Sequence, residues 1–217
     1  MKNSSKSVIH LILLFFVCQI GTGAFSSLAY LWSGSFVLGL YIGIILFNVP
    51  FLYILYKKTN VSIVSRVPDE GNTGFPLLKL LCIGVGLALV NFLFAHFLNP
   101  NPVGQGDDTS TITETIAFVL ETTLMASVVE EMFYRKWMIS YLERSKVKPA
   151  LILFVTSFLF FLAHTNWGNM SFRFDTFIFG MVQYYIYTKH RDVRCCIFVH
   201  SINNLLMTSI GLASKCL

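Results

Sequence analysis

Residues 130–135, Glu-Glu-Met-Phe-Tyr-Arg, place two adjacent acids and an arginine inside a long apolar stretch. A charge at bilayer depth costs roughly 2.5–3.5 kcal/mol on insertion scales, so such residues indicate a functional site by default. Glu131 and Arg135 are spaced i, i+4 and can form an ion pair on one helix face. Glu130 points roughly 100° away from that face. One acid, Glu131, can therefore be structural while its neighbour, Glu130, is chemically active.

Two later apolar stretches carry further polar groups. His164 follows Phe-Leu-Phe-Phe-Leu-Ala, and His200 and Asn204 share a helix face at i, i+4 spacing. Each group also has a structural interpretation, because a lone histidine is often a hydrogen-bonded core residue and a His–Asn pair can join neighbouring helices. Arg135, for its part, could simply snorkel at the membrane interface.

The depths of these groups can be compared along their helices. With Arg135 and Arg194 as marks of the membrane boundary, Glu130 lies roughly 7.5 Å inward and His200 roughly 9 Å inward. These two groups can therefore meet if their helices are neighbours.

His164 does not match the depth of Glu130 and His200, because it lies sixteen residues beyond Lys148. If the fifth span enters the membrane at Lys148, His164 lies too deep to meet them. It reaches Glu130 only if the fourth and fifth helices form a hairpin that projects past the boundary, with its tip near residues 144–148. Glu121, a further acid nine residues before Glu130, falls on the opposite face of a regular α-helix. Its role stays open between lining a cavity and bonding a neighbouring helix.

The elements that must position these groups are membrane spans. The chain of 217 residues is 55% hydrophobic and only 12% charged, whereas soluble domains average about 25% charged residues. A spanning helix needs about 20 apolar residues, and this predicts an all-α, polytopic membrane helix bundle. The seven candidate spans are 8–32, 36–56, 76–98, 112–142, 149–165, 172–188 and 195–213.

The net charge of +5 does not indicate nucleic-acid binding, because the lysines and arginines follow a topological pattern. They gather before the first span and in alternate loops, which predicts a cytoplasmic N-terminus and an external C-terminus. The first apolar stretch is long for a cleaved signal peptide and is expected to be a retained anchor. The five cysteines, an odd number without zinc-ligand spacing, predict no disulfide framework.

The strongest helix-breaking segment, 99–111, divides the chain into two parts. Residues 1–98 hold three spans with few ionisable groups and are expected to form an N-terminal scaffold. Residues 112–213 hold the remaining four spans and the polar groups. We expect the chemistry in this second part.

The order of three short motifs resembles the CAAX prenyl protease and bacteriocin-processing (CPBP) family of intramembrane proteases. The motifs are Glu-Glu-x-x-x-Arg at 130–135, Phe-x-x-x-His at 160–164 and His-x-x-x-Asn at 200–204. Each motif is weak alone, but three in this order on successive spans are specific. The resemblance covers about residues 112–213 and implies peptide-bond hydrolysis within the membrane.

The resemblance also implies roles for the individual residues. Glu130 would take a proton from water, and His164 would position that water. His200 and Asn204 would donate hydrogen bonds to the oxyanion of the tetrahedral intermediate. The supporting residues would be Glu131, Arg135 and Phe160, which hold and pack the site.

Metal dependence is the open point of this mechanism. Family members are often called metalloproteases, and zinc would take Glu130, His164 and His200 as ligands. The sequence contains no His-Glu-x-x-His pair, so a metal-free mechanism without a cofactor is favoured.

The expected partners are the lipid bilayer and a membrane-associated peptide or protein substrate. The compact chain suggests a bacterial cytoplasmic membrane and a role in bacteriocin or peptide-signal maturation, or in self-immunity. The alternative is a non-catalytic membrane immunity protein, or a partner of a sensor or transporter. Transport itself is less favoured, because neither internal repeats nor paired discontinuous helices are evident.

Overall fold

The computed structural model describes residues 2–61, 76–97, 111–165 and 172–214, and every regular element within these ranges is a helix. The predicted all-helical bundle is confirmed. The predicted helix-breaking segment, 99–111, lies largely outside the described residues. The helices form seven rods: α1 (Lys2–Ser33); α2 (Phe36–Gly43), η1 (Ile44–Asn48) and α3 (Val49–Thr59); α4 (Leu77–Phe97); α5 (Ile112–Leu120), η2 (Glu121–Ala126), α6 (Ser127–Glu131), η3 (Met132–Ile139) and α7 (Ser140–Arg144); α8 (Pro149–Ala163); α9 (Phe174–His190); and α10 (Val193–Ala213).

The rods differ in their ability to cross a bilayer. Five of those described are long and apolar enough to do so. Helix α8, with 15 residues, is shorter than the predicted span 149–165, whereas α9, with 17 residues, begins and ends two residues later than the predicted span 172–188. Both fall below the ~20 residues that a full crossing needs. Together the rods make this a multi-pass membrane protein.

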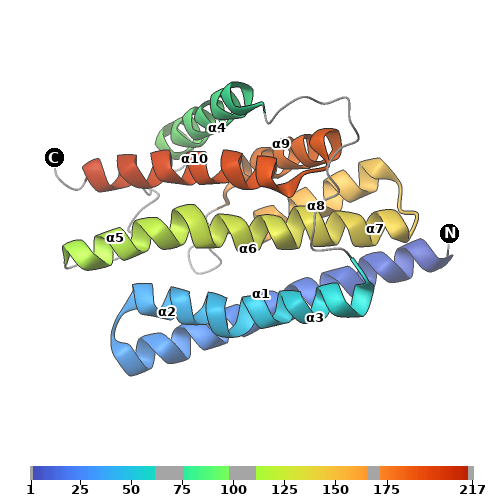
Figure 1. Cartoon of the computed structure of the whole chain (residues 1–217), viewed down its shortest axis with the longest axis horizontal. Helices are drawn as coiled ribbons and strands as arrows, with labels where there is room; N and C mark the ends of the chain where they lie inside the picture. The colour runs from blue at the N-terminus through green and yellow to red at the C-terminus, as the bar shows by residue number, and fades with distance from the viewer. Residues whose placement is uncertain (1, 62–75, 98–110, 166–171, 215–217) are drawn as a thin grey trace.

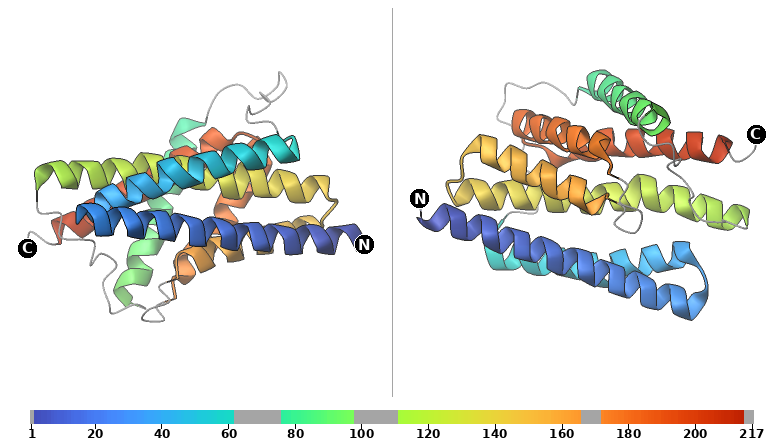
Figure 2. Two further views of the ribbon diagram at one scale, coloured as in Figure 1. Left: turned by 90° about the horizontal axis from the view of Figure 1, so that it is seen from below. Right: turned by 180° about the vertical axis from the view of Figure 1, so that it is seen from behind.

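The rod from α5 to α7 lies in the middle of the molecule (Figure 1). Helix α1 and the α2–α3 rod pack on one side of it, whereas α8, α9 and α10 lie on the other side, with α4 outside α10 (Figures 1 and 2). A residue in the middle of this rod can therefore contact both layers.

The core is centred on the second half of this central rod. Trp137, Met138, Ile139 and Leu142 are completely buried. The Trp137 ring stacks on Phe133 with the ring centroids 5.6 Å apart. Many large apolar side chains of α1, α2 and α4 are instead exposed, as expected of surfaces that face lipid.

A tight hairpin joins α7 to α8. Lys146 adopts the left-handed conformation with φ 56°, and the backbone N–H of Val147 donates to the Leu142 carbonyl. Pro149 opens α8, where its fixed φ and missing N–H cost nothing. The hairpin that a contact between Glu130 and His164 requires is thereby present, with its tip near residues 144–148.

The hairpin also removes the mismatch of depth between Glu130 and His164. Glu130 lies 14 residues before Arg144 at one foot of the turn, and His164 lies 15 residues after Pro149 at the other. Two antiparallel helices with arms of nearly equal length bring these residues to the same level. The contact therefore depends on the turn, whatever the position of the membrane boundary.

Close packing of α4 on α10 gives a test of the fold. A Cβ atom added at Gly84 would lie 2.9 Å from Ile202 Cγ2 and 3.2 Å from the Val199 carbonyl oxygen, whereas one at Gly86 would meet nothing within 4 Å. We expect Gly84→Ala to destabilise the protein by about 1–3 kcal/mol through overpacking. Gly86→Ala should leave stability unchanged or raise it, because alanine favours helix by about 0.8–1.0 kcal/mol.

Thermal unfolding of the two variants in the same detergent measures this difference. Equal melting temperatures for Gly84→Ala and Gly86→Ala would contradict the close α4–α10 contact.

Candidate active site

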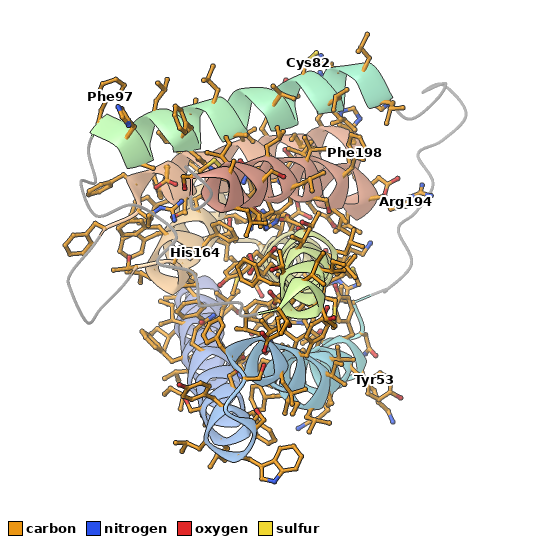
Figure 3. The ribbon with its side chains drawn as sticks, turned by 90° about the vertical axis from the view of Figure 1, so that its left-hand side faces the viewer. Tyr53, Cys82, Phe97, His164, Arg194 and Phe198 are labelled. Carbon is orange, nitrogen blue, oxygen red and sulfur yellow. The ribbon has the colours of Figure 1, made fainter. Side chains whose placement is uncertain are left out.

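Three of the predicted residues converge between the central rod and its neighbours. Glu130 lies on α6, His164 follows the last residue of α8, and His200 lies on α10. The Nε2 atoms of His164 and His200 are 3.8 and 3.9 Å from Glu130 Oε2. Figure 3 shows His164 at the end of α8, between the ribbons of α1 and α10. The side chains of Glu130 and His164 are about one third exposed, and that of His200 is buried.

A fully buried ionic cluster lies directly behind this site. Arg135 Nε is 3.2 Å from Glu131 Oε2, so the predicted i, i+4 pair is confirmed. The other oxygen of the same carboxylate, Glu131 Oε1, is 2.7 Å from His200 Nδ1. The sequence predicted the first contact but not the second, because nothing in the spacing shows which helix faces Glu131. The negative charge of Glu131 and the positive charge of Arg135 are buried together, so each compensates the other. A protonated His200 would be compensated by the same carboxylate.

Phe160 forms one wall of this cluster. The Arg135 guanidinium lies over its ring, 4.6 Å from the centroid, in cation–π geometry. The ring also packs 4.3 Å from the His164 ring and 6.1 Å from the His200 ring, centroid to centroid. Phe160 thus contacts three of the polar residues, and its predicted packing against the site is confirmed.

The contacts of His164 define its tautomer. Its Nδ1 is 2.8 Å from the Phe160 carbonyl oxygen. A carbonyl can only accept, so Nδ1 carries the hydrogen and Nε2 of the neutral ring carries a lone pair. That lone pair faces Glu130 and can accept a hydrogen bond from a water molecule that bridges His164 and Glu130.

His200 is held in the same way by a carboxylate. Its Nδ1–H donates to Glu131, so Nε2 of the neutral ring is again an acceptor. Nε2 becomes a donor only in the imidazolium form, for which Glu131 supplies the counter-charge. The oxyanion role that the resemblance implies for His200 thus requires a protonated ring.

Asn204 lies at one end of a chain of amides. Its Nδ2 donates to the Thr122 carbonyl at 2.9 Å, and its Oδ1 accepts from Asn203 Nδ2 at 3.1 Å. Asn203 Oδ1 in turn accepts from Asn91 Nδ2 at 2.9 Å. One N–H of Asn204 remains for a ligand.

Asn91 was missed as a site residue in the sequence. It lies on α4, within the part of the chain that was expected to be only a scaffold. An asparagine in the middle of an apolar span was the signal that could have identified it. Helix α4 therefore takes part in orienting the site.

The site opens into two cavities on opposite sides of α6. One, of about 190 Å³, lies between α1, the α2–α3 rod and the central rod. The other, of about 270 Å³, lies among the central rod, α4, α8, α9 and α10 and is lined by His200 and Asn204. Ala126, Glu130 and His164 line both. The Glu130 carboxylate can therefore be reached from both cavities.

The donor set gives no support to zinc. Within the described ranges, no group of three or more His, Cys, Asp or Glu side chains has an arrangement that could hold a metal ion. Glu130, His164 and His200 approach one another, but they do not form such a group. The fourth candidate ligand nearby, Glu131, already contacts Arg135 and His200.

Comparison with known proteins identifies the second part of the chain. Residues 112–206 match the Rce1-like family, described as type II CAAX prenyl endopeptidase. No match was found among curated proteins or among solved structures. The matched segment contains all three motifs, and the predicted resemblance to the CAAX protease family is confirmed. Residues 112–206 are thus similar to CAAX proteases, and the predicted enzyme class, a membrane protease, is confirmed at the level of the family.

The two adjacent acids should differ in their effect on stability. Glu131→Gln removes the charge that compensates buried Arg135, and we expect a loss of about 3–5 kcal/mol. Glu130→Gln should change stability little, because this side chain is partly exposed and has no direct hydrogen bond within the described structure. Thermal unfolding in one detergent compares the two. Similar melting temperatures would contradict the division into a structural and a free acid.

Proposed function

We propose that this protein is an intramembrane endopeptidase in which Glu130 activates a water molecule for attack on a peptide bond. The observation that carries the proposal is the convergence of two imidazole Nε2 atoms on one carboxylate oxygen. Separations of 3.8 and 3.9 Å are too long for direct hydrogen bonds and leave room for one bridging water.

The chemistry follows from the tautomers. Glu130 accepts one proton from the water, and the Nε2 lone pair of His164 accepts a hydrogen bond from the remaining O–H and orients the attack. The hydroxide oxygen bonds to the carbonyl carbon, and the carbonyl oxygen takes the negative charge. When the C–N bond breaks, Glu130 returns its proton to the leaving amine.

The oxyanion needs donors on the opposite side of the carbonyl. The protonated Nε2 of His200 and the remaining N–H of Asn204 serve here, since both side chains line the same cavity. A single donor of this kind contributes about 2.7–4 kcal/mol in comparable sites. Glu131 supplies the counter-charge for a His200 imidazolium, and the amide chain from Asn91 keeps Asn204 in place.

The biological setting is proposed from the charge pattern and the family. The distribution of lysines and arginines supports a cytoplasmic N-terminus and a substrate that enters from that side. A bacterial cytoplasmic membrane is the proposed location. Because bacteria do not generally prenylate proteins, a peptide precursor is the proposed substrate, in bacteriocin or peptide-signal maturation or in self-immunity.

Variants of the purified protein test catalysis. A panel of quenched fluorescent peptides is incubated with protein reconstituted in proteoliposomes. Glu130→Gln and His164→Ala should each lower the cleavage rate by about 10²–10⁴-fold, the usual range for a general acid–base residue. Glu114→Gln is the matched control, because Glu114 lies on the same rod but lines neither cavity.

Cleavage by Glu130→Gln at the rate of the unmodified protein would defeat the proposal. The non-catalytic alternative, an immunity or partner protein, predicts that no peptide is cleaved and that Glu130→Gln keeps the phenotype in cells.

Chelators give an independent test of the metal-free mechanism. We expect 1,10-phenanthroline and EDTA to leave the cleavage rate unchanged, because no step above uses a metal ion. Loss of activity that added zinc restores would overturn this mechanism in favour of zinc bound by Glu130, His164 and His200.

A further inference from the structure

Glu121 is a buried acid that the proposed mechanism does not use. It is 4% exposed and lies where α5 gives way to η2. It lines the cavity of about 190 Å³ on the α1 side of the central rod. No other side chain of the described chain forms a hydrogen bond or ion pair with its carboxylate. An isolated buried carboxylate is costly and calls for a compensating group.

The π-helical turns explain why Glu121 reaches this cavity. In a regular α-helix, nine residues would place it opposite Glu130, and that expectation from the sequence was wrong. The segment Glu121–Ala126 is π-helical, and a π-bulge adds one residue to a turn. One added residue shifts the face by roughly 100°, so both acids line the same cavity.

The acidic side chains that line this cavity give it a negative charge without a compensating lysine or arginine. Its lining contains the two carboxylates Glu121 and Glu130 and no lysine or arginine. The opposite wall is uncharged and combines apolar side chains with polar ones, among them Thr22, which donates to Asn48 Oδ1 at 2.5 Å. A low-dielectric cavity of this kind favours a cation, because buried charges are weakly screened there.

We propose that this cavity is a specificity pocket that binds a lysine or arginine side chain of the peptide substrate, with Glu121 as its counter-charge. The inference rests on the proposed protease function. Nine residues separate Glu121 from Glu130, or roughly 13 Å along the rod, which matches about four residues of an extended peptide. The basic side chain therefore belongs to a residue up to about four positions from the scissile bond.

A peptide panel tests this pocket. Each peptide carries Lys, Leu or Glu at one of the five positions on either side of the bond that is cleaved. The measurement is the ratio of kcat/KM for the Lys peptide to that for the Leu peptide at each position. We expect the unmodified protein to favour Lys at least tenfold at one position.

Three variants assign the preference to Glu121. In Glu121→Gln the Lys-to-Leu ratio should fall to about one, and in Glu121→Lys the Glu peptide should become better than the Lys peptide. Glu114→Gln, an acid of the same rod outside the cavity, should keep the original ratio. Melting temperatures show which variants are folded, and the ratio within one variant does not depend on the fraction that is active.

The outcomes separate this inference from the proposed function. If the unmodified protein cleaves no peptide, the protease function itself fails. If it cleaves Lys and Leu peptides equally well at every position, or if Glu121→Gln slows both by the same factor, the protease function stands and the specificity pocket is refuted. The equal loss would instead mark Glu121 as a structural acid.

Discussion

The buried cluster of Glu131, Arg135 and His200 is the interaction on which the rest of the site depends. Its members come from two helices, and all three are almost completely buried. Removal of one charge leaves another uncompensated at a depth where water cannot replace it. The cluster therefore couples the position of α10 to that of the central rod. It also orients His200, so that its second nitrogen points to Glu130.

Around this cluster, the central rod has a double function. Its second half supplies the most buried apolar side chains of the core, including Trp137, while its middle supplies the acids. The π-helical segments allow one rod to supply both the core side chains and the acids of the site. They change the direction in which side chains leave the rod, and Glu121 is the clearest case. Wide turns of this kind are rare and often occur at functional sites.

The two parts of the chain are not separated into a scaffold and a catalytic core as clearly as the sequence suggested. Residues 112–206 match the Rce1-like family, yet α4 contributes Asn91 to the amides that hold Asn204. On the other side, α1 and η1 form one wall of the cavity that reaches Glu130. The first three rods thus shape the surroundings of the site, although their sequences contain few ionisable residues.

The sequence by itself determined the membrane class, the helical bundle, the contact between Glu131 and Arg135, and the family. These features follow from composition, from i, i+4 spacing and from the order of short motifs along the chain, none of which requires knowing which helices are neighbours. Only the tertiary structure decided that His200 contacts Glu131, that Asn91 supports Asn204, and that Glu121 shares a cavity with Glu130. Such contacts depend on which helices are neighbours, on the equal arms of the α7–α8 hairpin and on π-helical turns that alter the face of a residue. The pattern of apolar residues in the sequence does not determine these contacts, because a membrane span has the same apolar pattern whether its surface faces lipid or another helix.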